Sequence, residues 1–194
     1  MTFEDFLPKL ERDLSSLSPK HRLAFGAACC ERAFLNLEDY GRASDRIDTS
    51  AVRQTLDEVW EFLESRRQQL HVAVLREACE AQMPPEHDNH ILAAAAGDAV
   101  QMVDLLLEQV IDSRPRLSRE IAGWAQASID NYLQVGPSRM QDLSVIQSSD
   151  LMQRELERQK GDLEWLKLNP TLDGATLAEF RARATVRGSS LAQH

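Results

Sequence analysis

The sequence lacks an apolar run that could cross a bilayer: the longest, ILAAAAG at residues 91–97, is far shorter than the roughly 20 residues required. It also lacks the sustained alternation of polar with β-branched or aromatic residues that is typical of strands. Cysteine is scarce, with three residues and two of them adjacent, so we expect no disulfide framework. Acidic Glu4 and Asp5 stand where an export signal carries positive charge. We therefore expect a cytoplasmic protein that does not bind membranes, which agrees with a reducing compartment.

Motifs for common catalytic chemistry are missing as well. The sequence contains no glycine-rich phosphate loop and no Gly-x-Ser-x-Gly elbow. Di-iron bundles use two Glu-x-x-His units, and no histidine of this chain follows a Glu at that spacing. Asp57, Glu61 and Glu64 recur along one face of a predicted helix and indicate a solvated surface rather than an acid–base pair. We expect no catalytic residues, no cofactor and no enzymatic activity.

Helical periodicity, by contrast, runs through the whole chain. Ser18 followed by Pro19 predicts a helix start, and Pro84, Pro85 and Pro170 predict helix ends. The length of 194 residues fits one domain with a full core. We predict a single all-α domain, a bundle of about eight helices. The expected helices cover 3–16, 19–37, 51–66, 68–82, 88–112, 118–133, 150–168 and 172–186, with loops at 38–49 and 136–149 and a frayed tail at 187–194.

Several glycines fall inside these predicted helices, where each weakens the helix relative to alanine. The ordinary reason for a glycine at such a position is close packing against a neighbouring helix. We therefore expect tight helix–helix contacts at Gly26, Gly97, Gly123 and Gly161.

The cysteine pair lies in the stretch AFGAACCERAF. At about 100° per residue, Cys29 shares a stripe with Phe25, while Cys30 points to the neighbouring face. Adjacent helical cysteines point apart and do not readily bridge each other. A reactive thiol needs a helix N-terminus or cations beside it, whereas these two sit mid-helix next to Glu31. We predict that both cysteines pack in the core and are unreactive, with redox use as the alternative.

A second candidate for chemistry is the stretch PPEHDNH, residues 84–90, because it concentrates metal-ligand residue types. His87 and His90 share a helical face if a helix has begun by that point. Zinc sites usually draw ligands from a second element, and the sequence offers no matching pair elsewhere. We expect no bound metal, with Asp88 as a helix cap and Glu86 near the positive end of the helix dipole.

The net charge of −9 is unevenly distributed, since eight acids and neither Lys nor Arg occur from Glu77 to Asp112. Such a field repels nucleic acid and attracts basic proteins. Side chains at Gln101, Asp104 and Glu108 recur on one polar arc of the predicted helix, and the opposite arc is apolar. Like charges at this spacing repel by a few tenths of a kcal/mol, and no base in the helix relieves them. We predict a partner-binding acidic ridge, with a merely solvated face as the alternative; it consists of Asp88, Gln101, Asp104, Glu108 and Asp112.

The order of several segments resembles the YjaG-like family of uncharacterised all-α bacterial proteins (domain of unknown function 416). The resemblance begins with AFGAACCERAF and VRQTLDEVWEFL and continues through AAGDAVQMVDLLLEQV, which includes Asp98, and ASIDNYL. It reaches RELERQKGDLEWL and spans nearly the whole chain, whereas the tail RGSSLAQH matches loosely. The resemblance implies a compact helical bundle and brings no established activity. A role in signalling is suggested for such proteins by gene neighbourhood.

Taken together, these features favour a non-enzymatic acidic helical binding module. The partner we expect is a basic protein, so that an immunity or inhibitor protein against a basic toxin or effector such as a nuclease is one example. A regulatory adaptor in bacterial signalling is the alternative, and a metal-dependent enzyme is a weaker one. The sequence leaves a homo-oligomer open.

Overall fold

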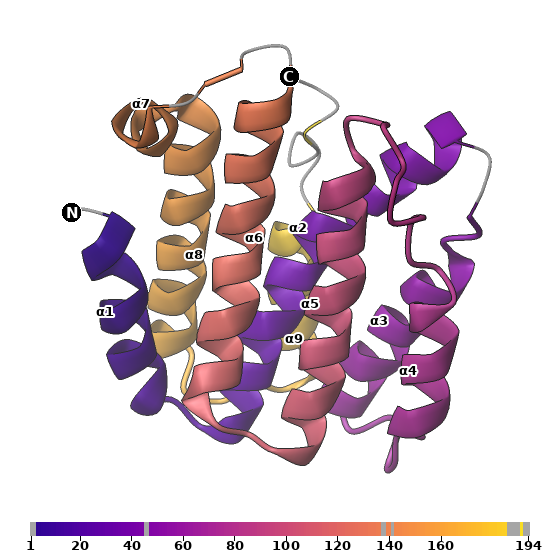
Figure 1. Cartoon of the computed structure of the whole chain (residues 1–194). Coiled ribbons are helices and arrows are strands. Elements are labelled where there is room, and N and C mark those ends of the chain that lie inside the picture. Colours follow the sequence, from indigo (N-terminus) through magenta and orange to yellow (C-terminus); the bar gives the residue numbers. More distant parts are fainter. Residues whose placement is uncertain (1–2, 45–46, 137–138, 141, 186–190, 192–194) are drawn as a thin grey trace.

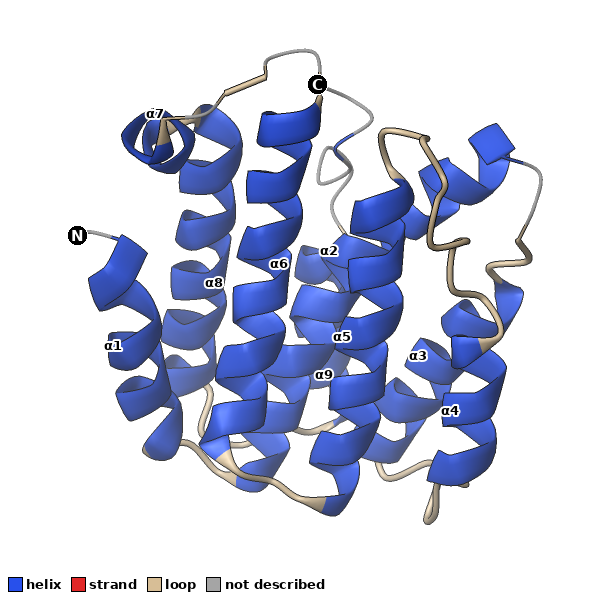
Figure 2. Ribbon diagram, viewed as in Figure 1, coloured by secondary structure: helices blue, strands red, loops and turns tan. Residues whose placement is uncertain are grey.

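In a computed structural model, the described residues are 3–44, 47–136, 139–140, 142–185 and 191. Within them the chain forms helices and no strand (Figure 2). The prediction of an all-α bundle is therefore confirmed. The helices are α1 (Phe3–Ser15), α2 (Pro19–Ser44), α3 (Ser50–Leu63), α4 (Val72–Glu80), α5 (Ala93–Ile111), α6 (Pro115–Val135), α7 (Leu143–Ser148), α8 (Asp150–Leu168) and α9 (Gly174–Ala184).

Helix α2 runs through the middle of the bundle (Figure 1). Helices α5 and α6 lie side by side against it, α1 and α8 lie beyond α6, and α3 and α4 lie on the other side of α5. Helix α9 also packs on α2. Within the described part of the chain, no helix combines the length and the apolarity that crossing a bilayer demands.

The central position of α2 follows from its sequence, because small and apolar residues occupy every face between Leu23 and Leu37. Gly26 sits where α2, α5 and α6 meet. A Cβ placed there would come within 2.9 Å of Gln109 Oε1 and 3.1 Å of a methyl group of Ile121. The expected close packing is thus confirmed at Gly26, since a larger residue would displace buried side chains of α5 and α6.

Two segments that we expected to be loops contain helix. Residues 38–44 extend α2, and the expectation of a loop there is wrong because the side chain of Tyr40 is fully buried and donates a hydrogen bond of 2.8 Å to Asp88. Tertiary contacts of this kind override the polar composition of the segment. The short helix α7 lies inside the expected loop 136–149, and Asp142 caps its first turn by accepting from the Ser144 amide.

The fifth helix starts later than the sequence suggests, and Leu191 of the tail is packed against the protein. Helix α5 begins at Ala93 rather than at residue 88, because the Asp88 carboxylate accepts the His90 amide at 2.8 Å and forms a turn before the helix. In the tail, Leu191 is buried, and its amide donates to Asn36 Oδ1 at 2.8 Å. The expectation of fraying is wrong at Leu191, and the other residues of 187–194 lie outside the described ones.

Candidate functional site

The acidic ridge predicted from sequence borders a groove between α4 and α5. The groove has a volume of about 330 Å³. Gln101 and Asp104 of α5 form one wall, and Arg76 and Glu80 of α4 form the other. The remaining lining is less polar: Cys79, Met83 and Val100. The groove therefore brings Gln101 and Asp104, two of the five predicted partner-binding residues, together with Glu80 of α4.

Asp104 is held in place by Arg76, which donates to both carboxylate oxygens, the longer bond measuring 2.6 Å. This hydrogen bonding and the charge of Asp104 raise the pKa of Arg76 above its ordinary value. The side chains are 45% and 32% exposed, and exposed pairs of this kind contribute about 0–1 kcal/mol. Arg76 of α4 therefore offsets part of the repulsion between the acids of α5. Because this ion pair is weak, a competing cation can replace Arg76.

The other members of the acidic ridge lie in different surroundings. Glu108, one turn beyond Asp104, is half-buried and forms no ion pair within the described part of the chain. Asp112 is the C-cap of α5 and pairs with Arg114 at 2.5 Å. Asp88 precedes α5 and accepts hydrogen bonds from Tyr40 and from the His90 amide, so it faces the protein. The structure therefore gathers Gln101, Asp104 and Glu108 and sets Asp88 apart.

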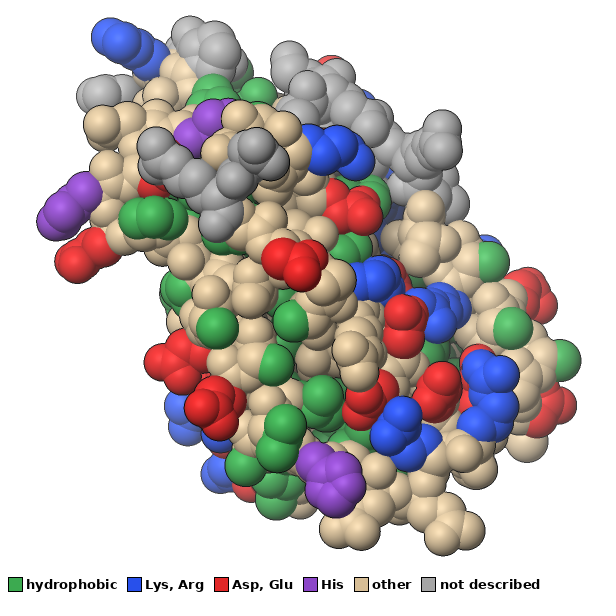
Figure 3. Space-filling view, turned by 90° about the vertical axis from the view of Figure 1, so that its right-hand side faces the viewer, with side chains coloured by type: hydrophobic (Ala, Val, Ile, Leu, Met, Phe, Trp, Pro, Cys, Tyr) green, Lys and Arg blue, Asp and Glu red, His purple; other side chains and the backbone are tan. Residues whose placement is uncertain are grey.

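Charge on this side of the molecule is mixed rather than uniformly negative. Figure 3 shows acidic and basic side chains interspersed on the side where α3 and α4 lie. In the groove itself the acids prevail, because Glu80 and Asp104 line it with Arg76 as the single base, and the charge of Glu108 also acts on Arg76. The excess negative charge is thus local to these two helices.

The prediction that the cysteines are buried is confirmed. Cys29 and Cys30 are 0% and 1% exposed. Burial raises the pKa of both thiols well above the ordinary value, and the nearby charge of Arg32 offsets this in part. Cys79, at the groove floor, is also buried and donates to the Thr55 hydroxyl. Thiols held protonated in this way are poor nucleophiles and poor metal ligands.

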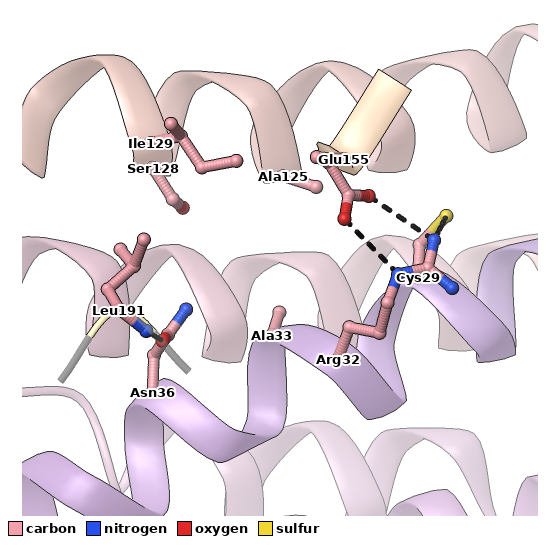
Figure 4. A pocket seen from close by; sticks show the side chains of 9 residues that line it. All are labelled: Cys29, Arg32, Ala33, Asn36, Ala125, Ser128, Ile129, Glu155 and Leu191. Atoms are coloured by element: carbon pink, nitrogen blue, oxygen red, sulfur yellow. Dashed lines mark hydrogen bonds and ion pairs between the residues drawn. The ribbon is translucent and has the colours of Figure 1, made fainter. Parts of the chain in front are cut away.

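A small cavity beside Cys29 is too tight for a substrate. It lies between α2, α6 and α8 and has a volume of about 30 Å³, enough for one or two waters (Figure 4). Arg32 and Glu155 point toward each other across it, and Ser128 lines it from α6. Ser128 is hydrogen-bonded to Asp98 at 2.7 Å, and burial raises the pKa of that carboxyl. The cavity is therefore a small gap lined by polar side chains of α2, α6 and α8.

Sequence reasoning missed two ion networks that share the adjacent residues Glu31 and Arg32 of α2. Arg32 is buried and contacts Glu155 at 3.2 Å and Asp162 at 2.7 Å, both on α8. Glu31 is buried and accepts from Arg53 of α3 at 2.6 Å and from α9 through Arg181 at 3.1 Å. The signal was present in the sequence, because a Glu-Arg pair inside a helix that is apolar on all faces must be buried and therefore paired.

The histidines of the PPEHDNH stretch do not converge. His87 is exposed, whereas His90 packs edge-on against Tyr40, with ring centroids 5.4 Å apart, and its Nδ1 accepts from the Leu92 amide. Among the described residues, no group of three or more His, Cys, Asp or Glu side chains is placed to hold a metal ion.

The described helices form an all-α bundle, and its central helix α2 carries the buried charges of Glu31 and Arg32. Residues 9–191 match the family described as protein of unknown function (DUF416), so the chain belongs to that family. A crystal structure of a DUF416 family protein from Shewanella baltica OS155 has the same fold. It superposes with a TM-score of 0.81 at 18% sequence identity, over 90% of this chain and 92% of that one. No curated protein matches the chain.

Proposed function

We propose that this protein is a non-enzymatic binding module whose α4–α5 groove receives a basic side chain of a protein partner. The observation that carries the proposal is the groove itself, where Glu80 and Asp104 lie beside Arg76 and the charge of Glu108 also acts on Arg76. A lysine or arginine of the partner replaces Arg76 as the counter-ion of Asp104. The exchange costs little because the existing pair is solvent-exposed.

The groove suits such a contact in shape as well as in charge. Met83 and Val100 provide apolar surface for the methylene stem of a lysine or arginine, while the carboxylates lie at the rim. Gln101 is exposed and adds an amide that donates to or accepts from the partner backbone. Methionine at a binding surface also adapts to different side-chain shapes.

The partner class that fits best is a cationic protein whose own function depends on a positive groove. An immunity or inhibitor protein that neutralises a basic toxin or effector, such as a nuclease, has this electrostatic design. Acidic residues then occupy the cationic substrate groove and speed the encounter of the two proteins.

Affinity capture with matched variants tests the proposal. The tagged protein is incubated with lysate of its source organism at low salt, and captured proteins are eluted with increasing salt and identified. We expect a basic protein that the double variant Asp104→Lys, Glu108→Lys fails to retain. The control Glu164→Lys, Glu179→Lys makes the same charge change at exposed positions on α8 and α9 and should retain it.

Folding of each variant is checked by circular dichroism and thermal unfolding. Should Asp104→Lys disturb the fold beside Arg76, the neutral pair Asp104→Asn, Glu108→Gln removes the same charges without introducing new ones. Equal recovery of the basic protein by wild type and by either folded variant would exclude the groove as its binding site.

A further inference from the structure

A second pocket lies on the α8–α9 face and has the opposite charge. Its volume is about 480 Å³, and arginines from three helices line it. Arg154 and Arg158 are one turn apart on α8 and so share a helical face, and Arg183 belongs to the last turn of α9. The full lining is Arg32, Arg154, Glu157, Arg158, Gly161, Asp162 and Arg183.

The acid at the base of this pocket is already matched by a base. Asp162 is buried and pairs with Arg32 at 2.7 Å. Arg158, by contrast, is half-buried and forms neither a hydrogen bond nor an ion pair with any residue that the structure describes. Burial lowers its pKa, and the positive charges of Arg32 and Arg154 act in the same direction, while the negative charges of Glu155 and Asp162 offset part of this shift. An anion in the pocket would relieve both effects.

Gly161 lines the same pocket and leaves part of its wall without a side chain. It lies in the interior of α8, where glycine costs about 1 kcal/mol relative to alanine. The expectation of close packing is wrong here, because a Cβ at Gly161 would meet nothing within 4 Å. The glycine therefore leaves backbone open on the wall of the pocket, as at sites where a ligand approaches the main chain.

We propose that this pocket binds the phosphate group of a small phosphorylated molecule, with Arg154, Arg158 and Arg183 donating to its oxygens and the bare backbone of Gly161 admitting it. The planar fork of arginine matches phosphate oxygens in pairs. A volume of about 480 Å³ exceeds a phosphate ion and falls in the range of small-molecule sites. Glu157 is exposed at the rim and accepts from a hydroxyl group such as that of a sugar.

Calorimetric titration with inorganic phosphate and with ribose 5-phosphate tests the proposal. Wild type is expected to bind both, and ribose 5-phosphate more tightly. Arg158→Gln should weaken both at least about ten-fold, as expected for loss of a charge-assisted hydrogen bond. Lys160→Gln removes the same charge from the same helix outside the pocket and should stay within about two-fold of wild type.

Gly161→Ala separates binding from folding. The added methyl group should raise the midpoint of thermal unfolding, because nothing crowds it, and weaken ribose 5-phosphate binding. The site assignment is overturned by absence of heat with both probes, by equal weakening in Lys160→Gln, or by unchanged affinity in Gly161→Ala. Equal affinity for the two probes contradicts the assignment to a phosphorylated molecule and identifies the free ion instead.

Discussion

Replacing Glu31 with glutamine tests how much the buried ion network of α2 contributes to stability. The Glu31 carboxylate is 1% exposed and accepts two hydrogen bonds from Arg53, at 2.6 and 2.8 Å. It also accepts from Trp60 Nε1 at 2.8 Å and from Arg181 at 3.1 Å. Glu31→Gln keeps the shape and opens no cavity, so the change in free energy of unfolding reports the charge and the hydrogen bonds.

The expected loss follows from the burial of the partners. Removing one member of a buried ion pair costs about 3–5 kcal/mol. Arg53 and Arg181 are each 28% exposed and keep Asp57 as a second partner, which places the estimate at the low end, near 3 kcal/mol. For a chain of this length, that corresponds to a fall of about 6–12 °C in the midpoint of thermal unfolding.

Urea unfolding followed by circular dichroism measures this loss. An equal dependence of the free energy of unfolding on urea concentration in wild type and variant shows that the two transitions can be compared. Asp57→Asn is the matched control: it removes the 44% exposed acid of the same network and should cost less than about 1 kcal/mol. A loss below about 1 kcal/mol for Glu31→Gln would refute the reasoning, as would equal losses in the two variants.

Two further predictions concern buried titratable groups. Native protein should resist thiol reagents at Cys29 and Cys30 until it unfolds, because burial keeps both protonated; rapid labelling of the folded protein would contradict this. Burial raises the pKa of Asp98, so the folded state binds more protons than the unfolded state between the unfolded pKa of about 4 and the higher folded pKa, and stability falls as pH rises through that window. Asp98→Asn should remove this fall while keeping an acceptor for Ser128; identical pH dependence of the urea midpoint in both proteins would show that Asp98 is not its source.

Local signals in the sequence predicted most of the fold. As predicted, α2 begins at Pro19 and α8 ends just before Pro170, and both helix boundaries follow from residue chemistry alone. Helix α6 begins at Pro115, three residues before the expected start. The errors occurred where tertiary contacts decide. Tyr40 extends α2 because it is buried, and Asp88 delays α5 because its carboxylate binds a nearby amide. Local helix propensity gives no information on either contact.

The sites were harder to predict, because their partners are distant in the chain. Arg76 reaches Asp104 across 28 residues, and Arg32 reaches Glu155 across 123. Helical periodicity places Asp104 and Glu108 on one face but gives no information on which helix lies opposite. The burial of Glu31 and Arg32 was predictable from their apolar neighbours, whereas the identity of their counter-ions depends on how α3, α8 and α9 dock.

The most direct test of the proposed function is the association rate of the captured partner, once purified, as a function of ionic strength. Wild type should associate at least about ten-fold faster at low salt than Asp104→Lys, Glu108→Lys, and the difference should shrink as salt screens the charges. The control Glu164→Lys, Glu179→Lys should stay within about two-fold of wild type. Equal rates for wild type and the groove variant at low salt would contradict binding of a basic partner at the α4–α5 groove.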